Sequence, residues 1–262
     1  RIYTGSYNFG WDLSDTTEVY SFGTIGTKFA QAYENYRVPN LIVGKNGVLP
    51  RPLGFSPKEA TDELDYAVTA GIAGDAGGWT YDLSSTYGRD EHDLSVLNSM
   101  NRSLYIDTST TTTNGFSPTD FHAGDFIGSQ WTTTFDIAMP FEVGAASPLT
   151  VAAGLEYRED TFEIKPGDEA SRYKEGSQSY PGFSLTDAGS HKRDSKAVYV
   201  DFAVDPIAAL QLDAAIRQVF HPAAHIVAAG GLLRAEAKSH ALHSSRVKHT
   251  SRRHFAPPSS KA

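Results

Sequence analysis

The fold class is decided by the stretch Lys196-Ala-Val-Tyr-Val-Asp-Phe-Ala-Val-Asp-Pro-Ile-Ala-Ala-Leu-Gln-Leu-Asp-Ala-Ala-Ile-Arg217. Apolar residues take every second position on both sides of a tight turn at Asp205–Ala208. Because successive side chains of a strand point to opposite faces, this pattern predicts a β-hairpin with one apolar and one polar face. The apolar face would hold Val198, Val200, Phe202, Val204, Leu210, Leu212 and Ile216, and the polar face Asp201, Gln211, Asp213 and Arg217.

The same two-residue period recurs along the whole chain before this hairpin. It predicts about eight strands of about ten residues, the length that a tilted strand needs to cross a bilayer. Tyr, Phe, Thr and Gly are frequent, which favours strands and turns over helices. The expected strands lie near 3–11, 18–29, 64–72, 79–87, 131–139, 149–157, 198–204 and 210–217.

The predicted connections alternate between short and long. Short ones fall near 13–17, 75–78, 140–148 and 205–208, and long ones near 30–63, 90–127 and 166–193. An up-and-down antiparallel sheet with turns at one end and long loops at the other is typical of outer-membrane β-barrels. A soluble β-sandwich also alternates apolar and polar residues, but it rarely needs loops this long. Aromatic residues near the strand ends fit interfacial girdles, namely Trp11, Trp79, Tyr87, Trp131 and Tyr157.

The composition excludes several classes of protein. Acidic residues outnumber basic ones 31 to 23, which argues against a nucleic-acid binder. The absence of cysteine excludes disulfides, thiolate zinc sites and a cysteine nucleophile. No apolar run reaches the roughly 20 residues of a transmembrane helix. The first residue, Arg1, is not an initiator Met and no signal peptide follows it, so we expect a fragment or a processed piece.

Residues 218–262 differ in character from residues 1–217. This tail has seven basic residues against one acid, Glu236, and six of the nine histidines. One interpretation is a disordered basic tail. The other is an aberrant end, for example an out-of-frame one, because the change falls within a strand pattern at Arg217. The out-of-frame interpretation predicts that no packed strand continues beyond Arg217, and that residues 218–262 are mobile or weakly helical and bury little apolar area.

Several segments in order resemble the barrel of TonB-dependent outer-membrane receptors. They are Tyr33-Glu-Asn-Tyr-Arg-Val-Pro-Asn40, Gly78-Trp-Thr-Tyr-Asp-Leu-Ser-Ser-Thr-Tyr-Gly-Arg89, Pro148-Leu-Thr-Val-Ala-Ala-Gly-Leu-Glu-Tyr-Arg-Glu-Asp160, Tyr180-Pro-Gly-Phe183 and Lys196-Ala-Val-Tyr-Val-Asp-Phe-Ala203.

The resemblance covers residues 1–217 and implies part of a barrel of about 22 strands. It also implies a location in the outer membrane of a Gram-negative bacterium, in contact with its lipid. Such receptors import scarce nutrients, including ferric siderophores, vitamin B12 and sugars, with energy delivered by TonB to the intact protein. The family's plug domain, TonB box and closing strand are not recognisable in this chain. The resulting expectation is an open or incompletely closed segment, 1–217, followed by the tail, 218–262. The alternatives are a soluble β-rich binding module and a passive porin.

The sequence offers few candidate binding residues and no enzyme chemistry. Arg89-Asp-Glu-His-Asp93 contains cation ligands but is more typical of a solvated loop. Glu156, Arg158, Glu159 and Asp160 are candidate lumen contacts, or ordinary ion pairs of a polar interior. No nucleophile elbow is recognisable, so no catalytic residue, cofactor or metal site is predicted.

Two further patterns receive structural interpretations. His221 and His225 have the i, i+4 spacing of zinc ligands on a helix, but the glutamate of the metalloprotease motif is missing. A glycine group lacks the Lys-Ser/Thr of a phosphate loop and is interpreted as a strand end and a turn; its members are Gly71, Gly74, Gly77 and Gly78. The threonine run 108–113 is expected to be a flexible outer loop.

Overall fold

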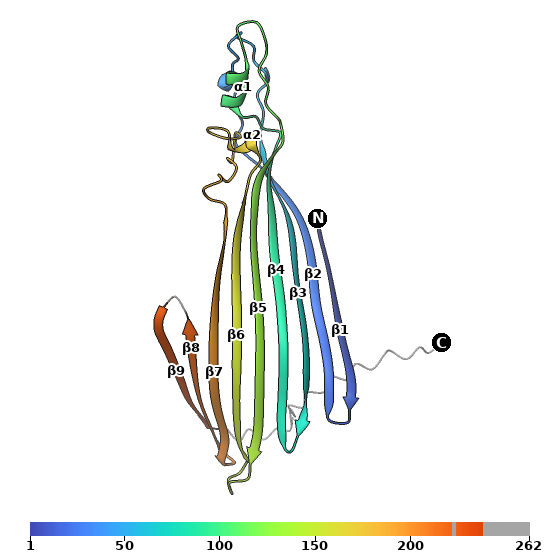
Figure 1. Ribbon diagram of the computed structural model, residues 1–262, viewed down its shortest axis with the longest axis vertical. Coiled ribbons are helices and arrows are strands. Elements are labelled where there is room, and N and C mark those ends of the chain that lie inside the picture. The colour runs from blue at the N-terminus through green and yellow to red at the C-terminus, as the bar shows by residue number, and fades with distance from the viewer. Residues whose placement is uncertain (222–223, 238–262) are drawn as a thin grey trace, which may run out of the picture.

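The computed structural model describes residues 1–221 and 224–237, and the side chains of residues 1–220. This part of the chain is one antiparallel sheet in which each strand pairs with its neighbours in sequence (Figure 1). The strands are β1 (Ile2–Ser14), β2 (Thr17–Tyr33), β3 (Lys58–Ala76), β4 (Trp79–Leu97), β5 (Phe121–Phe141), β6 (Leu149–Pro166), β7 (Gly189–Ile207), β8 (Leu210–His221) and β9 (Ala224–Ala237).

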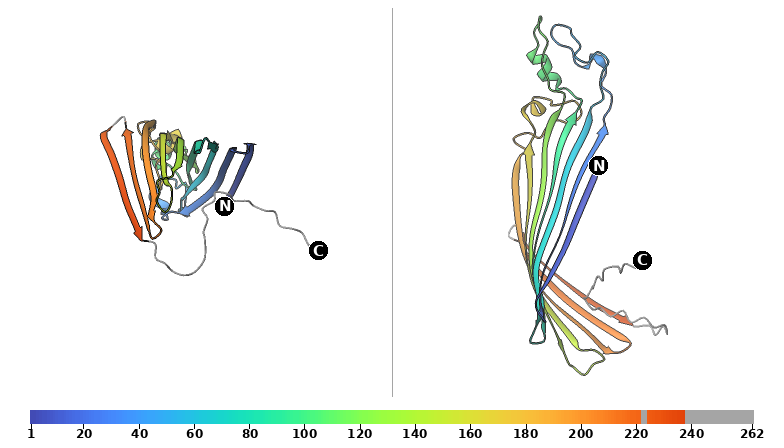
Figure 2. Two further views of the ribbon diagram at one scale, coloured as in Figure 1. Left: turned by 90° about the horizontal axis from the view of Figure 1, so that it is seen from below. Right: turned by 90° about the vertical axis from the view of Figure 1, so that its right-hand side faces the viewer.

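The predicted all-β, up-and-down architecture is confirmed, and the sheet is not closed. β1 and β9 are its two edges and do not pair with each other. The sheet is strongly twisted, so that β7–β9 slant across β1–β4 in the side view (Figure 2). Eight strands begin within residues 1–217, as predicted.

The expectation that strand pairing ends at Arg217 is wrong. β8 continues to His221, and β9 pairs with it from Ala224 to Ala237. The physical reason is that β8 offers a row of free backbone groups with which residues 224–237 pair. Most of these residues are alanine, glycine and leucine, so backbone pairing rather than strand propensity accounts for β9. Residues 238–262, the rest of the tail, lie outside the described residues.

Short turns and long connections lie at opposite ends of the sheet, as predicted (Figure 1). Gly77 and Gly78 form the β3–β4 turn with φ of 59° and 86°, values that suit a two-residue hairpin turn and favour glycine. The long connections, 34–57, 98–120 and 167–188, are shorter than predicted. The strands are correspondingly longer, up to 21 residues in β5.

The three long connections fold together into one cap rather than extending as separate loops. They carry the short helices η1 (Pro39–Leu41), α1 (Arg102–Thr108) and α2 (Glu169–Arg172). Ile42 and Phe55 of the first connection pack with Met100 and Tyr105 of the second, and all four are buried. The cap therefore has its own small core at the outer ends of the strands (Figures 1 and 2).

Asn101 joins the second connection to the third. Its side chain is fully buried; it accepts a hydrogen bond from the Leu104 amide and donates to the carbonyls of Ala170 and Tyr173, at 2.7–2.9 Å. One amide thus caps α1 and ties it to the α2 segment. None of the helices in the described residues is long and apolar enough to cross a membrane.

Candidate functional site

The two faces of the sheet differ sharply in charge. Directly paired residues share a face, so the registers of β3–β8 place one continuous set of side chains on the side of Leu155. None of these side chains is charged, and we call the set the uncharged band. It consists of Leu64, Tyr66, Val68, Ala70, Ile72, Trp79, Tyr81, Leu83, Ser85, Tyr87, Trp131, Thr133, Phe135, Ile137, Met139, Leu149, Val151, Ala153, Leu155, Tyr157, Val198, Val200, Phe202, Val204, Leu210, Leu212, Ala214 and Ile216.

Aromatic rings border the uncharged band at both ends. Toward the cap, Tyr66 packs on Tyr87 and Trp131 on Tyr157, each with ring centroids 6.2 Å apart. Toward the short turns, Trp79 contacts Phe141 edge-on at 6.4 Å. The nine residues from Trp79 to Tyr87 span about 26 Å along β4.

On this face, charge returns toward the cap at a different level on each strand. Arg89, Glu159 and Lys196 pair directly with Tyr66, Trp131 and Tyr157 of the aromatic row. The first charged residues there are Asp62 on β3, Arg89 on β4, Asp125 on β5, Glu159 on β6 and Lys196 on β7. Within the band, the few polar side chains bond to one another. Trp131 donates its Nε1–H to Ser85 Oγ at 2.7 Å, and Ser85 and Thr133 share a hydrogen bond of 3.0 Å.

The opposite face, which we call the polar face, carries two matching tyrosine–aspartate bridges. Tyr20 of β2 reaches across β3 and donates its hydroxyl hydrogen to Asp82 of β4, with both carboxylate oxygens at 2.9 Å. Tyr199 of β7 reaches across β6 and donates to Asp136 of β5 at 2.6 Å. Asp82 and Asp136 are direct partners in the β4–β5 register, so the two bridges meet at a pair of carboxylates.

Glycine makes each bridge possible. A Cβ at Gly71 would lie 2.4 Å from the Tyr20 ring, and a Cβ at Gly154 would lie 2.2 Å from the Tyr199 ring. Each tyrosine therefore lies flat over the strand that it crosses. Two carboxylates placed directly opposite each other repel, and the two phenol donors offset that repulsion.

Three of the four predicted lumen contacts lie on the polar face, and the fourth does not. Glu156 pairs with Arg217 at 2.9 Å and with Arg158 at 3.4 Å, and Asp160 pairs with Arg193 at 2.9 Å. Glu159 lies on the other face, just beyond the uncharged band, where Lys192 Nζ is 3.0 Å from its carboxylate. Glu159 lies on the other face because successive side chains of a strand point to opposite faces, so it is separated from Glu156, Arg158 and Asp160.

The run Arg89–Asp93 is part of β4 and not a loop, and the strand divides it between the two faces. On the polar face, His92 Nε2 lies 3.0 Å from Asp90 and its Nδ1 lies 3.8 Å from Glu63. The Glu63 carboxylate also binds Lys28 Nζ at 2.7 Å. An ammonium group therefore already pairs with one of the two carboxylates in this cluster.

A second cluster forms on the other face, with ligand types that suit a cation. His122 Nε2 lies 2.8 Å from Asp125 and 3.7 Å from Asp93. Lys165 Nζ lies 3.2 Å from the second oxygen of Asp125. Both histidine–carboxylate clusters are thus supplied with a lysine, and ion pairing accounts for their geometry.

The remaining residues singled out from the sequence have structural roles. His221 ends β8 and His225 lies in β9, so the helical spacing is not realised. Thr108 ends α1, and its hydroxyl donates to the Leu104 carbonyl at 2.7 Å. In the cap, Asp107 accepts hydrogen bonds from Lys174 and Tyr173, and these lower the pKa of its carboxyl group.

The tyrosine–aspartate bridges were not predicted from the sequence. Their signal is a glycine that pairs with a tyrosine on the neighbouring strand, which can be seen only when the register is known. The chain matches no protein-family model and no curated protein.

Proposed function

We propose that these strands belong to an outer-membrane β-barrel, with the uncharged band against lipid and the polar face toward the lumen. The observation that carries this proposal is the band itself, which is free of charge over six strands, about 26 Å long on β4 and bordered by aromatic rows. Barrel walls of this type have an apolar outer zone about 25 Å tall, flanked by aromatic girdles, and a polar interior.

Within that architecture we propose a TonB-dependent receptor for a scarce small nutrient, such as a ferric siderophore or a saccharide. The resemblance of five ordered segments supports this assignment. The folded cap at the long-loop end supports it too, because a preformed loop surface suits capture of a ligand. The polar face supplies hydrogen-bonding and charged groups along the route inward.

The membrane proposal has a direct test in the three tryptophans. Trp11, Trp79 and Trp131 all lie on the lipid-facing side and are 38–62% exposed. In vesicles that contain brominated lipid, we expect their fluorescence to be quenched. As matched reporters, a single tryptophan is placed at position 152 or 153 of a chain in which the native tryptophans are replaced by Phe. Brominated lipid should quench the tryptophan at position 153 and not the one at position 152. Equal quenching at the two positions, or full extraction into buffer without detergent, would contradict the proposal.

The receptor proposal needs a transport measurement in cells that produce an intact receptor containing these strands, because this open sheet is not expected to transport on its own. Uptake of the nutrient should depend on TonB and on an energised inner membrane. Uptake that persists without TonB would instead indicate a passive pore.

A further inference from the structure

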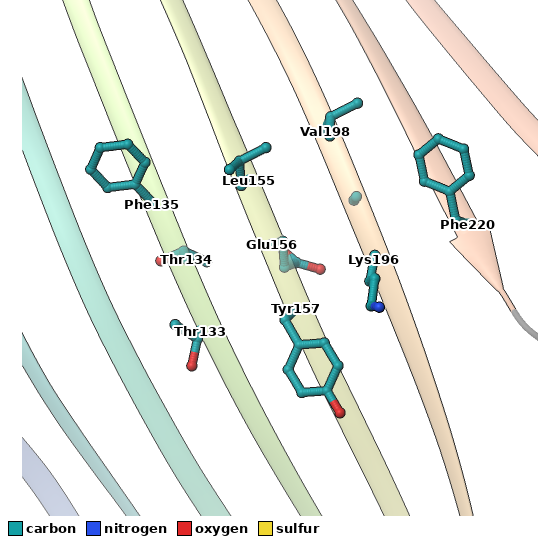
Figure 3. A pocket seen from close by; sticks show the side chains of 10 residues that line it. Thr133, Thr134, Phe135, Leu155, Glu156, Tyr157, Lys196, Val198 and Phe220 are labelled. Carbon is teal, nitrogen blue, oxygen red and sulfur yellow. The ribbon is translucent and has the colours of Figure 1, made fainter.

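An apolar hollow on the uncharged side lies away from the route of a water-soluble nutrient. It has a volume of about 450 Å³, and Phe135, Leu155 and Val198 are among the side chains that line it (Figure 3). In the proposed orientation this hollow opens toward lipid. A nutrient that passes the cap would instead meet the polar face, where the strands extend beyond the aromatic row toward the cap.

On the polar face, between the cap and the level of the aromatic row, a patch of the sheet carries almost no side chains. Its members are Ala67 of β3, Gly88 of β4 and Gly128 of β5, and we call it the glycine floor. Ala67 and Gly88 are direct partners, and Gly128 lies diagonally next to Gly88. A Cβ at Gly128 would meet nothing within 4 Å, and one at Gly88 would make only ordinary contacts at 3.8 Å. A ligand can therefore approach the backbone closely here.

Aromatic side chains border the glycine floor on the β6 side. Phe162 pairs directly with Gly128 and is 48% exposed. Its ring lies nearly parallel to that of Phe126, with centroids 6.1 Å apart and an interplanar angle of 25°. Phe183 of the third connection packs on Phe126 with centroids 4.6 Å apart, so the cap helps to fix these rings. An exposed ring held beside an open backbone offers a stacking surface to a ligand.

Two carboxylates face Phe162 across the glycine floor. Asp90 of β4 is the direct partner of Gly128 on the side opposite Phe162, so two strand spacings, about 10 Å, separate the backbones of Asp90 and Phe162. Asp65 of β3 pairs directly with Asp90. His92 Nε2 lies 3.0 Å from Asp90, whereas the Asp65 side chain takes part in no hydrogen bond or ion pair with the side chains that the structure describes. Facing carboxylates repel, and hydroxyl donors of a ligand would offset that repulsion.

Hydrogen-bond donors border the glycine floor toward the short turns. Gln130 pairs directly with Gly88 and donates to Asp160 at 2.7 Å. Arg193 donates its Nε–H to the same carboxylate at 2.9 Å. An amide nitrogen carries two hydrogens and a guanidinium carries five, so both side chains can donate further hydrogen bonds to a ligand.

The charges around the glycine floor disfavour an anionic ligand. Lys28 already binds Glu63 at 2.7 Å, and Arg193 already binds Asp160 at 2.9 Å. The two carboxylates that face Phe162 have no lysine or arginine partner among the described side chains. Negative charge therefore remains in excess, and it would repel an anion and accept hydrogen bonds from hydroxyl groups.

We propose that the glycine floor binds one ring of an uncharged saccharide. The apolar C–H face of the sugar ring stacks on Phe162, hydroxyl groups on one edge donate to Asp65 and Asp90, and hydroxyl oxygens on another edge accept from Gln130 and Arg193. A sugar ring suits this site because it combines an apolar face with hydroxyl groups that both donate and accept. The inference rests on the proposed receptor function and selects a saccharide, rather than an anionic ferric siderophore, as the nutrient.

The test measures saccharide binding by the full chain in detergent micelles, after its folding has been verified by the shift in gel mobility on heating. Saturation-transfer NMR detects sugar ring protons that pack against a protein. The probes are maltotriose, cellotriose and xylotriose, with trigalacturonic acid as an anionic counterpart. We expect saturation of the ring protons of at least one uncharged trisaccharide and none for trigalacturonic acid. Absence of saturation for all three uncharged probes overturns the saccharide site.

Substitutions locate the binding on the chain. Gly128→Leu fills the glycine floor and should abolish the saturation, whereas Ala138→Leu, which adds the same side chain on the same strand and face ten residues away, should leave it unchanged. Phe162→Ala should weaken binding about tenfold, and Phe162→Trp, which keeps a ring, should retain it. An equal loss with both leucine variants overturns the placement of the site.

Two further outcomes separate this inference from the receptor proposal. Binding of a ferric tris-catecholate that Gly128→Leu abolishes, without binding of any saccharide, overturns the choice of nutrient and supports the receptor. Saccharide binding that Gly128→Leu abolishes, combined with TonB-independent uptake of that saccharide by an intact receptor containing these strands, supports the site and overturns the TonB-dependent receptor.

Discussion

Ala152 and Ala153 of β6 offer the sharpest test of the face assignment, because the same residue type occupies adjacent positions on opposite faces. Ala153 lies four residues from each end of the band on β6, Leu149 and Tyr157, and so marks its centre. Its partners are Ile137 and Val200. Ala152 faces Ala138 and Asp201 on the polar face.

In the proposed membrane orientation, Ala153→Arg places a guanidinium at the midplane of the lipid-facing side. Such a charge costs about 2–4 kcal/mol there, which lowers the folding equilibrium constant roughly 30-fold to 1,000-fold. Ala152→Arg places the same group beside the Asp201 carboxylate, so its effect should stay within about 0.5 kcal/mol.

The assay is equilibrium unfolding by urea from lipid vesicles, read by tryptophan fluorescence and by the shift in gel mobility on heating. Both variants are compared with the parent chain in the same lipid. If the two arginines destabilise the protein equally, or if Ala152→Arg is the more harmful, the face assignment fails.

Three further predictions concern the polar face and the cap. Gly154→Ala should lower the free energy of unfolding by about 1–3 kcal/mol, because the new Cβ displaces Tyr199 from Asp136. At Gly128 a Cβ meets nothing within 4 Å, so Gly128→Ala should be neutral or slightly stabilising in the same urea titration. Asn101→Ala should lower the free energy of unfolding of the cap by about 2–3 kcal/mol and speed proteolysis of the 98–120 and 167–188 connections. Asn114→Ala loses only an exposed hydrogen bond to Asn46 and should do neither, and unchanged proteolysis of Asn101→Ala would contradict the role of Asn101. Because Lys174 and Tyr173 lower the pKa of Asp107, its hydrogen bonds persist through the usual aspartate range near pH 4 and are lost as pH falls through the lowered pKa. Amide exchange in the cap should therefore accelerate only in that more acidic range, and Asp107→Asn should remove this acid-induced acceleration.

The positions and faces of the strands could be predicted because the band enforces a strict two-residue period. The strand lengths could not, and β4 shows why. From Arg89 to Asp93 every residue is polar, so both faces carry charge and the hydrophobic alternation disappears. Backbone pairing nevertheless continues to Leu97, because it needs no apolar face.

The cap and the bridges lay beyond sequence reasoning for a different reason. The cap core joins Phe55 to Tyr105, and the Tyr199–Asp136 bridge joins residues 63 apart in sequence. Local patterns cannot specify which distant partners meet. Glu159 is the opposite case, since strict alternation alone would have placed it apart from Glu156, Arg158 and Asp160.

The extra length of the strands has a consequence for how the protein would meet the outside world. β4 continues ten residues past the aromatic ring of Tyr87, about 33 Å along the strand. These strand extensions therefore hold the cap well away from a bilayer whose surface lies at the level of Tyr87. In the proposed outer-membrane orientation, large soluble macromolecules such as antibodies could bind the cap without touching lipid. A peptide epitope inserted at the tip of the 98–120 connection would then be accessible to them on intact cells.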